Sequence, residues 1–317
     1  MPAHWTPVPH LLRPDEAATV TGALRAVGRF RLYSEEGRSD GLGAGLPERY
    51  DLARQVLARS DDEQAWQRAT RLNVFRETLA TADSAVDGRW RWFRNHPRLR
   101  ELAGGGLVEP VIVYANAMLP GMELAVHDDV PAFRGLDRET VPQWLLCVMR
   151  RSGLFDRWHI PTVHVISWWS ATSGGDFLVG RDGDRLPSLW NRAVVGDFEA
   201  IPHGVDRVGG ADAPPRLVPG GTLQLGRGGW SAQGPDGEVL ARFPDAAVRF
   251  SLSWRARVFA DAADAARVRD HSDDLTLDAA LRTLTKELRE RGILPKRARR
   301  PRPRLFAKML VEAWPDP

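Results

Sequence analysis

The most informative stretch of this chain reads Glu123-Leu-Ala-Val-His127-Asp-Asp129-Val-Pro131. Ahead of it, Val111-Ile-Val-Tyr114-Ala-Asn116 has the β-branched and aromatic composition of a strand, and Leu119-Pro-Gly121 is typical of a turn. We therefore expect residues 122–126 to run extended into the histidine. Side chains two residues apart on an extended segment point to the same side, so His127 and Asp129 can reach one metal ion.

Two later runs supply partners for this pair. Ile201-Pro-His203-Gly-Val205 delivers a second histidine onto a predicted strand. Val248-Arg249-Phe-Ser251-Leu-Ser-Trp254 opens a period-2 run that reaches Phe259, with Arg249, Ser251, Ser253 and Arg255 on one face. Two imidazoles and one carboxylate cover half of an octahedral Fe(II) and leave positions for a chelating co-substrate and dioxygen. These residues predict a non-haem iron site.

The sequence between the two histidines also reads as strands. Residues 161–170 are β-branched and aromatic, and the pair Gly174-Gly175 lies between two strand-like runs. This arrangement predicts a hairpin. Polar residues along one face of the 246–259 strand predict a barrel with a liganded interior.

With its order of strand, His127-x-Asp129, glycine pair, His203 and Arg249-x-Ser251, the chain resembles the Fe(II)/2-oxoglutarate-dependent dioxygenase superfamily from about Leu107 to Ala260. The resemblance implies an α+β fold around a double-stranded β-helix, a jelly-roll, cupin-like core, with N-terminal and C-terminal helices. It also implies that His127, Asp129 and His203 are the catalytic iron ligands. Arg249 would hold the distal carboxylate of 2-oxoglutarate, with Ser251 beside it.

Charge favours an arginine in that position. Fe(II) with two neutral imidazoles and one carboxylate carries one net positive charge, so a bound dianion makes the buried assembly negative and requires a cation. Arginine engages both carboxylate oxygens with its planar fork. In many members of the superfamily this arginine follows the second histidine closely, whereas residues 209–245 intervene here. Arg255 and Arg257 therefore stay open as alternatives to Arg249.

The intervening residues are rich in glycine and proline. The segments 220–226 and 237–243 within them have strand-like composition. We expect the two segments to form an extra hairpin.

Several other side chains are candidates for lining the pocket. Tyr114 and Asn116 share one strand face and can contact 2-oxoglutarate or substrate. Trp168 and Trp169 must point to opposite sides, so Trp168 is the candidate for the pocket. Arg134, just past the metal pair, is a candidate for binding a substrate carboxylate.

His164 stays open as an alternative metal ligand to His203, although a hydrogen-bonded core histidine is the preferred interpretation.

The implied reaction uses Fe(II), 2-oxoglutarate and O2 and releases succinate and CO2. Related halogenases replace the carboxylate ligand with a small residue, and this chain keeps Asp129. Hydroxylation after hydrogen abstraction is therefore favoured over halogenation, with desaturation and ring formation left open. The expected substrate is a small polar molecule, either an amino acid or a specialised-metabolite intermediate.

Two other features of the sequence bear on different classes of function. The basic segment Lys296–Arg304 suggests a nucleic-acid-directed oxygenase or an RNA-binding protein. Against this, the net charge is only +3 and no nucleic-acid-reading motif is present in the sequence. A cupin-type metalloenzyme without 2-oxoglutarate would not need Arg249. A barrel that has lost its chemistry would need neither Arg249 nor the metal ligands.

The length and composition of the chain limit how many domains it can form. The 317 residues, 43% of them hydrophobic, predict a single domain. Its expected parts are a mainly helical support at 1–106, the jelly-roll catalytic core at 107–260, and a helical extension with the basic segment at 261–317. Helices are expected from Pro14, from Pro47 through Leu79, and over 275–292. Without an apolar span or leader, we expect a soluble cytoplasmic protein, and Cys147 is expected to be a buried thiol.

Overall fold

The computed structural model describes residues 5–33, 74–85, 87–104, 106–180, 183–210, 214–215, 217–218 and 220–314. The chain divides into two compact units, each with its own hydrophobic core. Among the described residues, the first unit comprises those within 5–33, 74–127 and 162–258, and the second comprises those within 128–161 and 259–314.

A large antiparallel sheet forms one side of the first unit. In the described residues its strand order is β1-β9-β6-β14-β4-β3-β2-β11-β12-β13. The strands are β1 (Trp5–Val8), β2 (Arg29–Leu32), β3 (Phe75–Thr81), β4 (Leu107–Met118), β6 (Thr162–Trp168), β9 (Arg192–Gly196), β11 (Thr222–Gly226), β12 (Gly229–Gln233), β13 (Val239–Phe243) and β14 (Arg249–Phe259).

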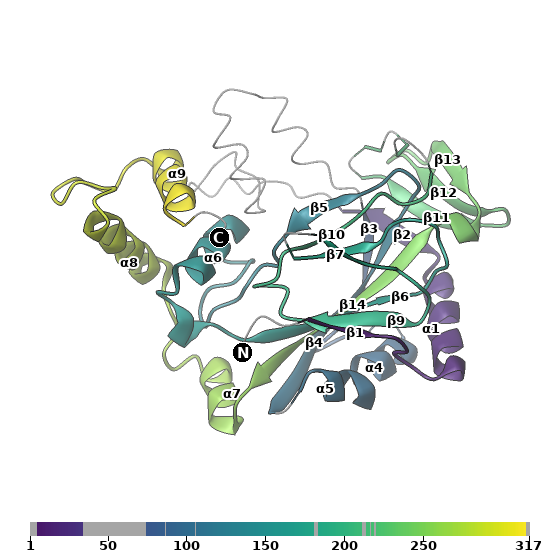
Figure 1. Cartoon of the computed structure of the whole chain (residues 1–317), viewed down its shortest axis with the longest axis horizontal. Coiled ribbons are helices and arrows are strands. Elements are labelled where there is room, and N and C mark those ends of the chain that lie inside the picture. The colour runs from purple at the N-terminus through teal and green to yellow at the C-terminus, as the bar shows by residue number, and fades with distance from the viewer. Residues whose placement is uncertain are drawn as a thin grey trace. The chain divides into compact units, whose positions relative to one another are not determined.

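A smaller sheet faces the central strands of the large one (Figure 1). Its order is β5-β10-β7-β8, with bounds β5 (Leu124–His127), β7 (Phe177–Val179), β8 (Asp184–Leu186) and β10 (His203–Val205). Among the barrel strands, β4, β6, β9 and β14 belong to the large sheet while β5, β7, β8 and β10 belong to the small one. The orders β9-β6-β14-β4 and β5-β10-β7-β8 are those of a jelly roll, in which two Greek keys close around one interior. The predicted fold class is confirmed.

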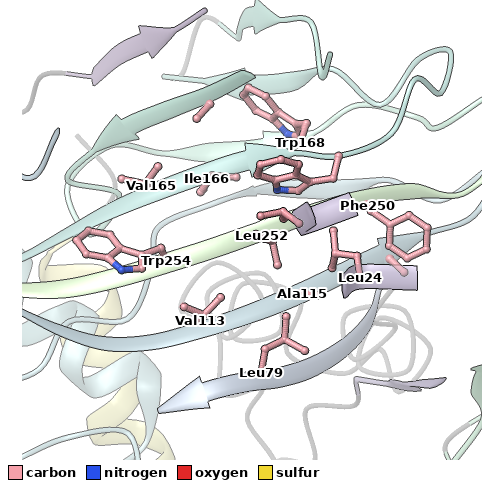
Figure 2. Packing of buried hydrophobic residues seen from close by; sticks show 14 of the residues in the cluster. Leu24, Leu79, Val113, Ala115, Val165, Ile166, Trp168, Phe250, Leu252 and Trp254 are labelled. Atoms are coloured by element: carbon pink, nitrogen blue, oxygen red, sulfur yellow. The ribbon is translucent and has the colours of Figure 1, made fainter. Parts of the chain in front are cut away.

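Three helices cover the outer face of the large sheet: α1 (Pro14–Val27), α4 (Gly88–Arg94) and α5 (Pro97–Leu102) (Figure 1). Helix α1 begins at the predicted proline, and Gly28 ends it in the left-handed conformation with φ at 70°. Trp254 of β14 donates its indole N–H to the carbonyl of Arg94, at 2.8 Å. Figure 2 shows Leu252 and Trp254 packed with Val113 and Ala115 of β4 in this core.

The alternation predicted for β14 is also confirmed. Phe250, Leu252 and Trp254 belong to the core beneath the helices. A strand projects successive side chains to opposite faces, so Arg249, Ser251, Ser253 and Arg255 point into the barrel. The barrel therefore has a polar stripe along one wall.

Two predicted hairpins are wrong. Gly174 and Gly175 do not join paired strands, because β6 lies in the large sheet and β7 in the small one. Their positive φ values, 67° and 69°, turn the chain from one sheet to the other. In the insertion, β11 and β13 do not pair with each other, because β12 lies between them and pairs with both. The insertion is thus a three-stranded meander attached to β2 through β11.

The expectation of a mainly helical support at 1–106 is wrong in one respect. The first hundred residues contribute three strands, β1, β2 and β3, to the large sheet. Most of the helix expected from Pro47 through Leu79 falls outside the described residues. Its last part is strand β3, which pairs with β4. Cross-strand pairing has overridden the helical pattern there.

The second unit is built from helices. They are α6 (Gln143–Ser152), α7 (Ala262–Arg269), α8 (Leu277–Glu290) and α9 (Pro303–Ala313), with short 3₁₀ helices η1 (Asp156–Trp158) here and η2 (Asp245–Ala247) in the first unit. Helix α8 confirms the predicted amphipathic helix, and Gly292 follows it with φ at 73°. Cys147 is buried on α6 as expected. No helix in the described part of the chain is long and apolar enough to cross a membrane.

Candidate metal centre

His127 and His203 lie opposite each other on neighbouring strands. Strand β5 ends at His127, β10 begins at His203, and the two are register partners in an antiparallel pair. Partners in such a pair project to the same face, with Cβ atoms roughly 5 Å apart. The two imidazole centroids are accordingly 4.5 Å apart. Strand pairing thus joins two histidines that are distant in sequence.

Asp129 completes the cluster. One ligand atom from each of His127, Asp129 and His203 lies within 4.8 Å of the others. Among the described residues, this is the only group of histidine, cysteine or acidic side chains that meets that spacing. Asp128 instead forms an ion pair with Arg151 of α6. Extended spacing therefore selects the second aspartate, as the sequence predicts.

The surroundings of His203 fix its orientation. The ring is 4% exposed and lies 4.7 Å from Phe198 and 5.6 Å from Phe177, measured between centroids. Its Nδ1 is 3.2 Å from the carbonyl oxygen of Ile201. A carbonyl only accepts, so Nδ1 carries the proton and Nε2 has the lone pair that a metal needs. Two imidazoles with one carboxylate are a donor set suited to Fe(II).

Arg249 is buried in the interior of the same barrel. Its Nε donates to the carbonyl of Gly175 at 2.8 Å and its Nη2 to the hydroxyl of Ser188 at 2.9 Å, while Nη1 is 3.8 Å from the sulfur of Met118. All of these partners are neutral. Burial lowers the pKa of Arg249 to about 9, and the charge of nearby Asp176 opposes that shift. A buried cation hydrogen-bonded only to neutral groups favours an anion beside it.

Sequence reasoning missed the residues that hold Arg249. The sequence pattern predicts only a turn at Gly175 and indicates no role for Ser188. The Ser188 hydroxyl donates to the Gly175 carbonyl at 2.7 Å, so both residues fix the same end of the arginine. The glycine pair was visible in the sequence, but its contact with β14 depends on the path between the sheets.

Trp168 and Ser251 are register partners on β6 and β14. Both are buried, and the Trp168 ring packs 5.8 Å from that of Phe177. The Trp168 indole Nε1 is buried and has no hydrogen-bond partner among the described residues. A buried N–H without an acceptor is costly, so this donor is available to a molecule in the barrel. Trp169 points the other way, toward Phe93 of α4.

Tyr114 and Asn116 share a face of β4 with Met118, the residue in contact with Arg249. Both contact a residue that sequence reasoning missed, Arg76 of β3. Its Nε donates to Asn116 Oδ1 at 2.9 Å, and its guanidinium carbon lies 4.5 Å from the centre of the Tyr114 ring. These two residues therefore lie on the barrel face.

Arg134 has a different role from the one expected. Its guanidinium forms a bidentate ion pair with Asp273, at 2.8 and 2.9 Å, and also donates to the carbonyl of Arg157. The hydrogen bond from Arg134 is the main cause that holds the pKa of Asp273 below its ordinary value. With a carboxylate already bound, Arg134 ties two segments of the second unit together and is not available for a substrate carboxylate.

The alternative ligand His164 and the alternative arginine Arg255 contact each other. His164 is buried, and its Nε2 lies 2.6 Å from Nε of Arg255 and 3.1 Å from the Thr162 hydroxyl. His164 is outside the metal-binding cluster, which supports its interpretation as a hydrogen-bonded core histidine. Arg257 lies opposite Thr162, far along β14 from Arg249.

No family model matches the sequence, and no curated relative does. Comparison with solved structures finds a Pseudomonas putida prolyl-4-hydroxylase, at 11% identity over 81% of this chain and 94% of that chain, with a TM-score of 0.41. It also finds SnoN, the non-haem α-ketoglutarate-dependent epimerase from nogalamycin biosynthesis, at 12% identity over 81% and 79%, with a TM-score of 0.41.

A third similar structure is HygX from Streptomyces hygroscopicus with nickel and 2-oxoglutarate bound. It shares 9% identity over 81% of this chain and 83% of that chain, with a TM-score of 0.39. Likenesses at this level carry no weight in assigning an activity. The fold rests on strand order, and the function must rest on the side chains in the barrel.

Proposed function

We propose that this protein is an Fe(II)- and 2-oxoglutarate-dependent oxygenase that removes hydrogen from, and hydroxylates, a small polar molecule. The observation that carries the proposal is the approach of ligand atoms from His127, Asp129 and His203 to within 4.8 Å of one another. The jelly roll that holds them also buries Arg249, whose hydrogen-bond partners in the described part of the chain are all neutral.

Charge and hydrogen bonding support this co-substrate. Fe(II) with Asp129 and two neutral imidazoles carries one positive charge, and Arg249 adds another. A dicarboxylate such as 2-oxoglutarate neutralises both, which satisfies the requirement that buried charges be paired. The fork of Arg249 suits a carboxylate, and the buried Trp168 indole offers a further donor.

Each group of residues in the barrel has its own role in the proposed function. His127, Asp129 and His203 hold the metal, and the Ile201 carbonyl fixes the protonation of His203. Gly175 and Ser188 orient Arg249 toward the distal carboxylate. When bound there, iron, 2-oxoglutarate and O2 would supply the oxidising chemistry for hydrogen removal from the substrate, with release of succinate and CO2. The aromatic rings of Phe177, Phe198 and Trp168 keep bulk water from that space.

Anaerobic titration tests the proposal. Fe(II) is added to the full-length protein with and without 2-oxoglutarate, and visible absorption is recorded. We expect a metal-to-ligand charge-transfer band only with the keto acid, and no band in His203→Ala. Fe(II) binding without any such band would favour a cupin-type metalloenzyme and contradict the proposal.

The substrate is identified separately. Succinate release is measured across a panel of amino acids and specialised-metabolite intermediates, with the protein lacking iron as the blank. A compound that raises succinate release and gains one oxygen atom by mass is the expected result. A product two hydrogens lighter, without added oxygen, would indicate desaturation or ring formation instead of hydroxylation.

A further inference from the structure

Arg76 is held between two aromatic rings on the interior side of the large sheet. Its guanidinium carbon lies 4.2 Å from the centre of the Tyr33 ring and 4.5 Å from that of Tyr114. Its Nε donates to Asn116 Oδ1 at 2.9 Å. Arg76 is on β3, Tyr114 and Asn116 are on β4, and Tyr33 directly follows β2; these three strands are neighbours in the sheet (Figure 1). Two aromatic rings and one hydrogen-bond acceptor therefore hold the guanidinium in place.

The two terminal nitrogens of Arg76 have no protein partner in the described part of the chain. In the described residues they make no hydrogen bond, and no carboxylate pairs with this side chain. Glu77, the neighbouring acid on β3, projects to the opposite face and lines a groove with Ala23 and Trp90 beneath the helices. A guanidinium that is stacked and hydrogen-bonded on one side presents a preorganised fork on the other, and this fork matches an oxyanion.

Arg76 also lies close to the proposed co-substrate position. Asn116, which accepts its hydrogen bond, is two residues from Met118, and the Met118 sulfur lies 3.8 Å from Arg249 Nη1. Two residues of strand span roughly 7 Å, with both side chains on one face. Arg76 on β3 and Arg249 on β14 therefore lie on the same interior wall, on opposite sides of β4.

The charges on the interior wall indicate the kind of ligand that Arg76 would bind. In the proposed function, 2-oxoglutarate neutralises the iron site together with Arg249, which leaves Arg76 as an additional cation on the same wall. We propose that Arg76 anchors a carboxylate or phosphate group of the substrate. This inference rests on the proposed function, and it narrows the substrate class from small polar molecules to anionic ones.

Saturation-transfer proton NMR of methylphosphonate and acetate tests the anchor directly. The full-length protein is loaded with Zn(II) and saturating 2-oxoglutarate, so that Arg249 is occupied. We expect both probes to bind and Arg76→Gln to weaken them by about tenfold or more, because a hydrogen bond to a charged group is lost. Arg76→Lys should fall between the two, since it keeps the charge without the fork. Arg242→Gln on β13 is the matched control for net charge and should bind as the wild type does.

Two outcomes would overturn the inference: no binding of either probe by the wild type, or equal binding by Arg76→Gln. The iron and 2-oxoglutarate absorption band, recorded on the same variants, separates this test from that of the proposed function. If Arg76→Gln abolishes the band, Arg76 belongs to the co-substrate site and the substrate anchor is wrong. If no protein gives the band but Arg76 still governs probe binding, the anion site stands and the oxygenase proposal fails.

Discussion

The side chain of Arg249 passes directly over the α-carbon of Gly175. A Cβ placed on Gly175 would lie 2.7 Å from Cδ of Arg249, and the backbone there has φ at +69°. Only glycine meets both conditions without strain. The turn that carries the chain from one sheet to the other therefore also makes room for the arginine.

This contact leads to a first prediction. Gly175→Ala should displace Arg249 and weaken 2-oxoglutarate binding by about tenfold or more, because a charged hydrogen-bond donor leaves its position. Gly180→Ala is the control, since Gly180 has a similar φ of +73° with no atom within 4 Å of the added Cβ. Titration of the charge-transfer band measures both affinities. Equal losses in the two variants would mean that backbone strain, and not the arginine, is responsible.

Adjacent aspartates allow a matched test of the metal ligands. Asp129→Ala should weaken Fe(II) binding by more than about 100-fold. Loss of a residue that only supports a ligand already costs up to about 100-fold in metal affinity, and loss of a ligand should cost more. Asp128→Ala removes the same charge from the neighbouring position and breaks the pair with Arg151. We expect it to bind Fe(II) as the wild type does. Similar Fe(II) dissociation constants for the two variants would contradict the proposed triad.

The ionisation of Arg249 predicts a pH dependence. Its pKa of about 9 means that the free protein loses this cation as the pH rises through that value. Binding of a dianion requires the charged form, so affinity for 2-oxoglutarate should be constant near pH 7 and fall above about pH 9, approaching tenfold per pH unit. Saturation-transfer NMR of 2-oxoglutarate on the metal-free protein measures this, and a flat profile to high pH would exclude Arg249 as the partner.

Asp176 provides a second variant for that experiment. Its charge raises the pKa of Arg249 against the effect of burial. Asp176→Asn should therefore move the fall in affinity to lower pH. Asp184→Asn, an exposed change on β8, should leave the profile where it is in the wild type.

Packing beneath the helices predicts the cost of a core substitution. Leu252 is 0% exposed between its neighbours on the outer face of β14. Leu252→Ala should lower the free energy of unfolding by about 2–5 kcal/mol, as expected for a leucine deleted from a close-packed core. Chemical denaturation measures the loss. A change below about 1 kcal/mol would show that this part of the sheet is loosely packed.

The ion pair between Arg134 and Asp273 distinguishes a structural role from substrate binding. Arg134→Met and Asp273→Asn each break the pair, so both should lower the melting temperature of the protein. Neither should alter the charge-transfer band with 2-oxoglutarate. Because the pKa of Asp273 is lowered in the folded state, this stabilisation is present above the ordinary carboxyl pKa and is lost as the pH falls. An Asp273→Asn variant as stable as the wild type would contradict this role.

The sequence alone could predict the parts of the site that depend on local periodicity. His127 and Asp129 share a side because extended backbone alternates, and the polar face of β14 follows the same rule. The arrival of His203 on a strand was also readable from its flanking residues. None of these predictions required knowledge of which strands pair.

The wrong and missed predictions all concern contacts between residues that are distant in sequence, either between paired strands or in an ion pair. The Gly174-Gly175 turn has the composition of a hairpin, but nothing local states that the next strand belongs to the other sheet. Strand β12 was missed because it pairs between two segments that were recognised. Arg76 was missed because it falls within the helix expected from Pro47 through Leu79, whereas its contacts with Asn116 and Tyr114 arise only from the register of β3 and β4. Arg134 was misassigned because its partner, Asp273, is remote in sequence.

The meander β11–β13 leaves the barrel after His203 and returns before Arg249. Its strands extend the edge of the large sheet and occupy none of the positions that hold the metal ligands or the arginine. The number of residues separating these functional groups can therefore vary widely while their separation in space does not. A pattern search that requires a fixed gap between histidine and arginine would pass over chains of this kind, whereas one that matches strand order would retain them.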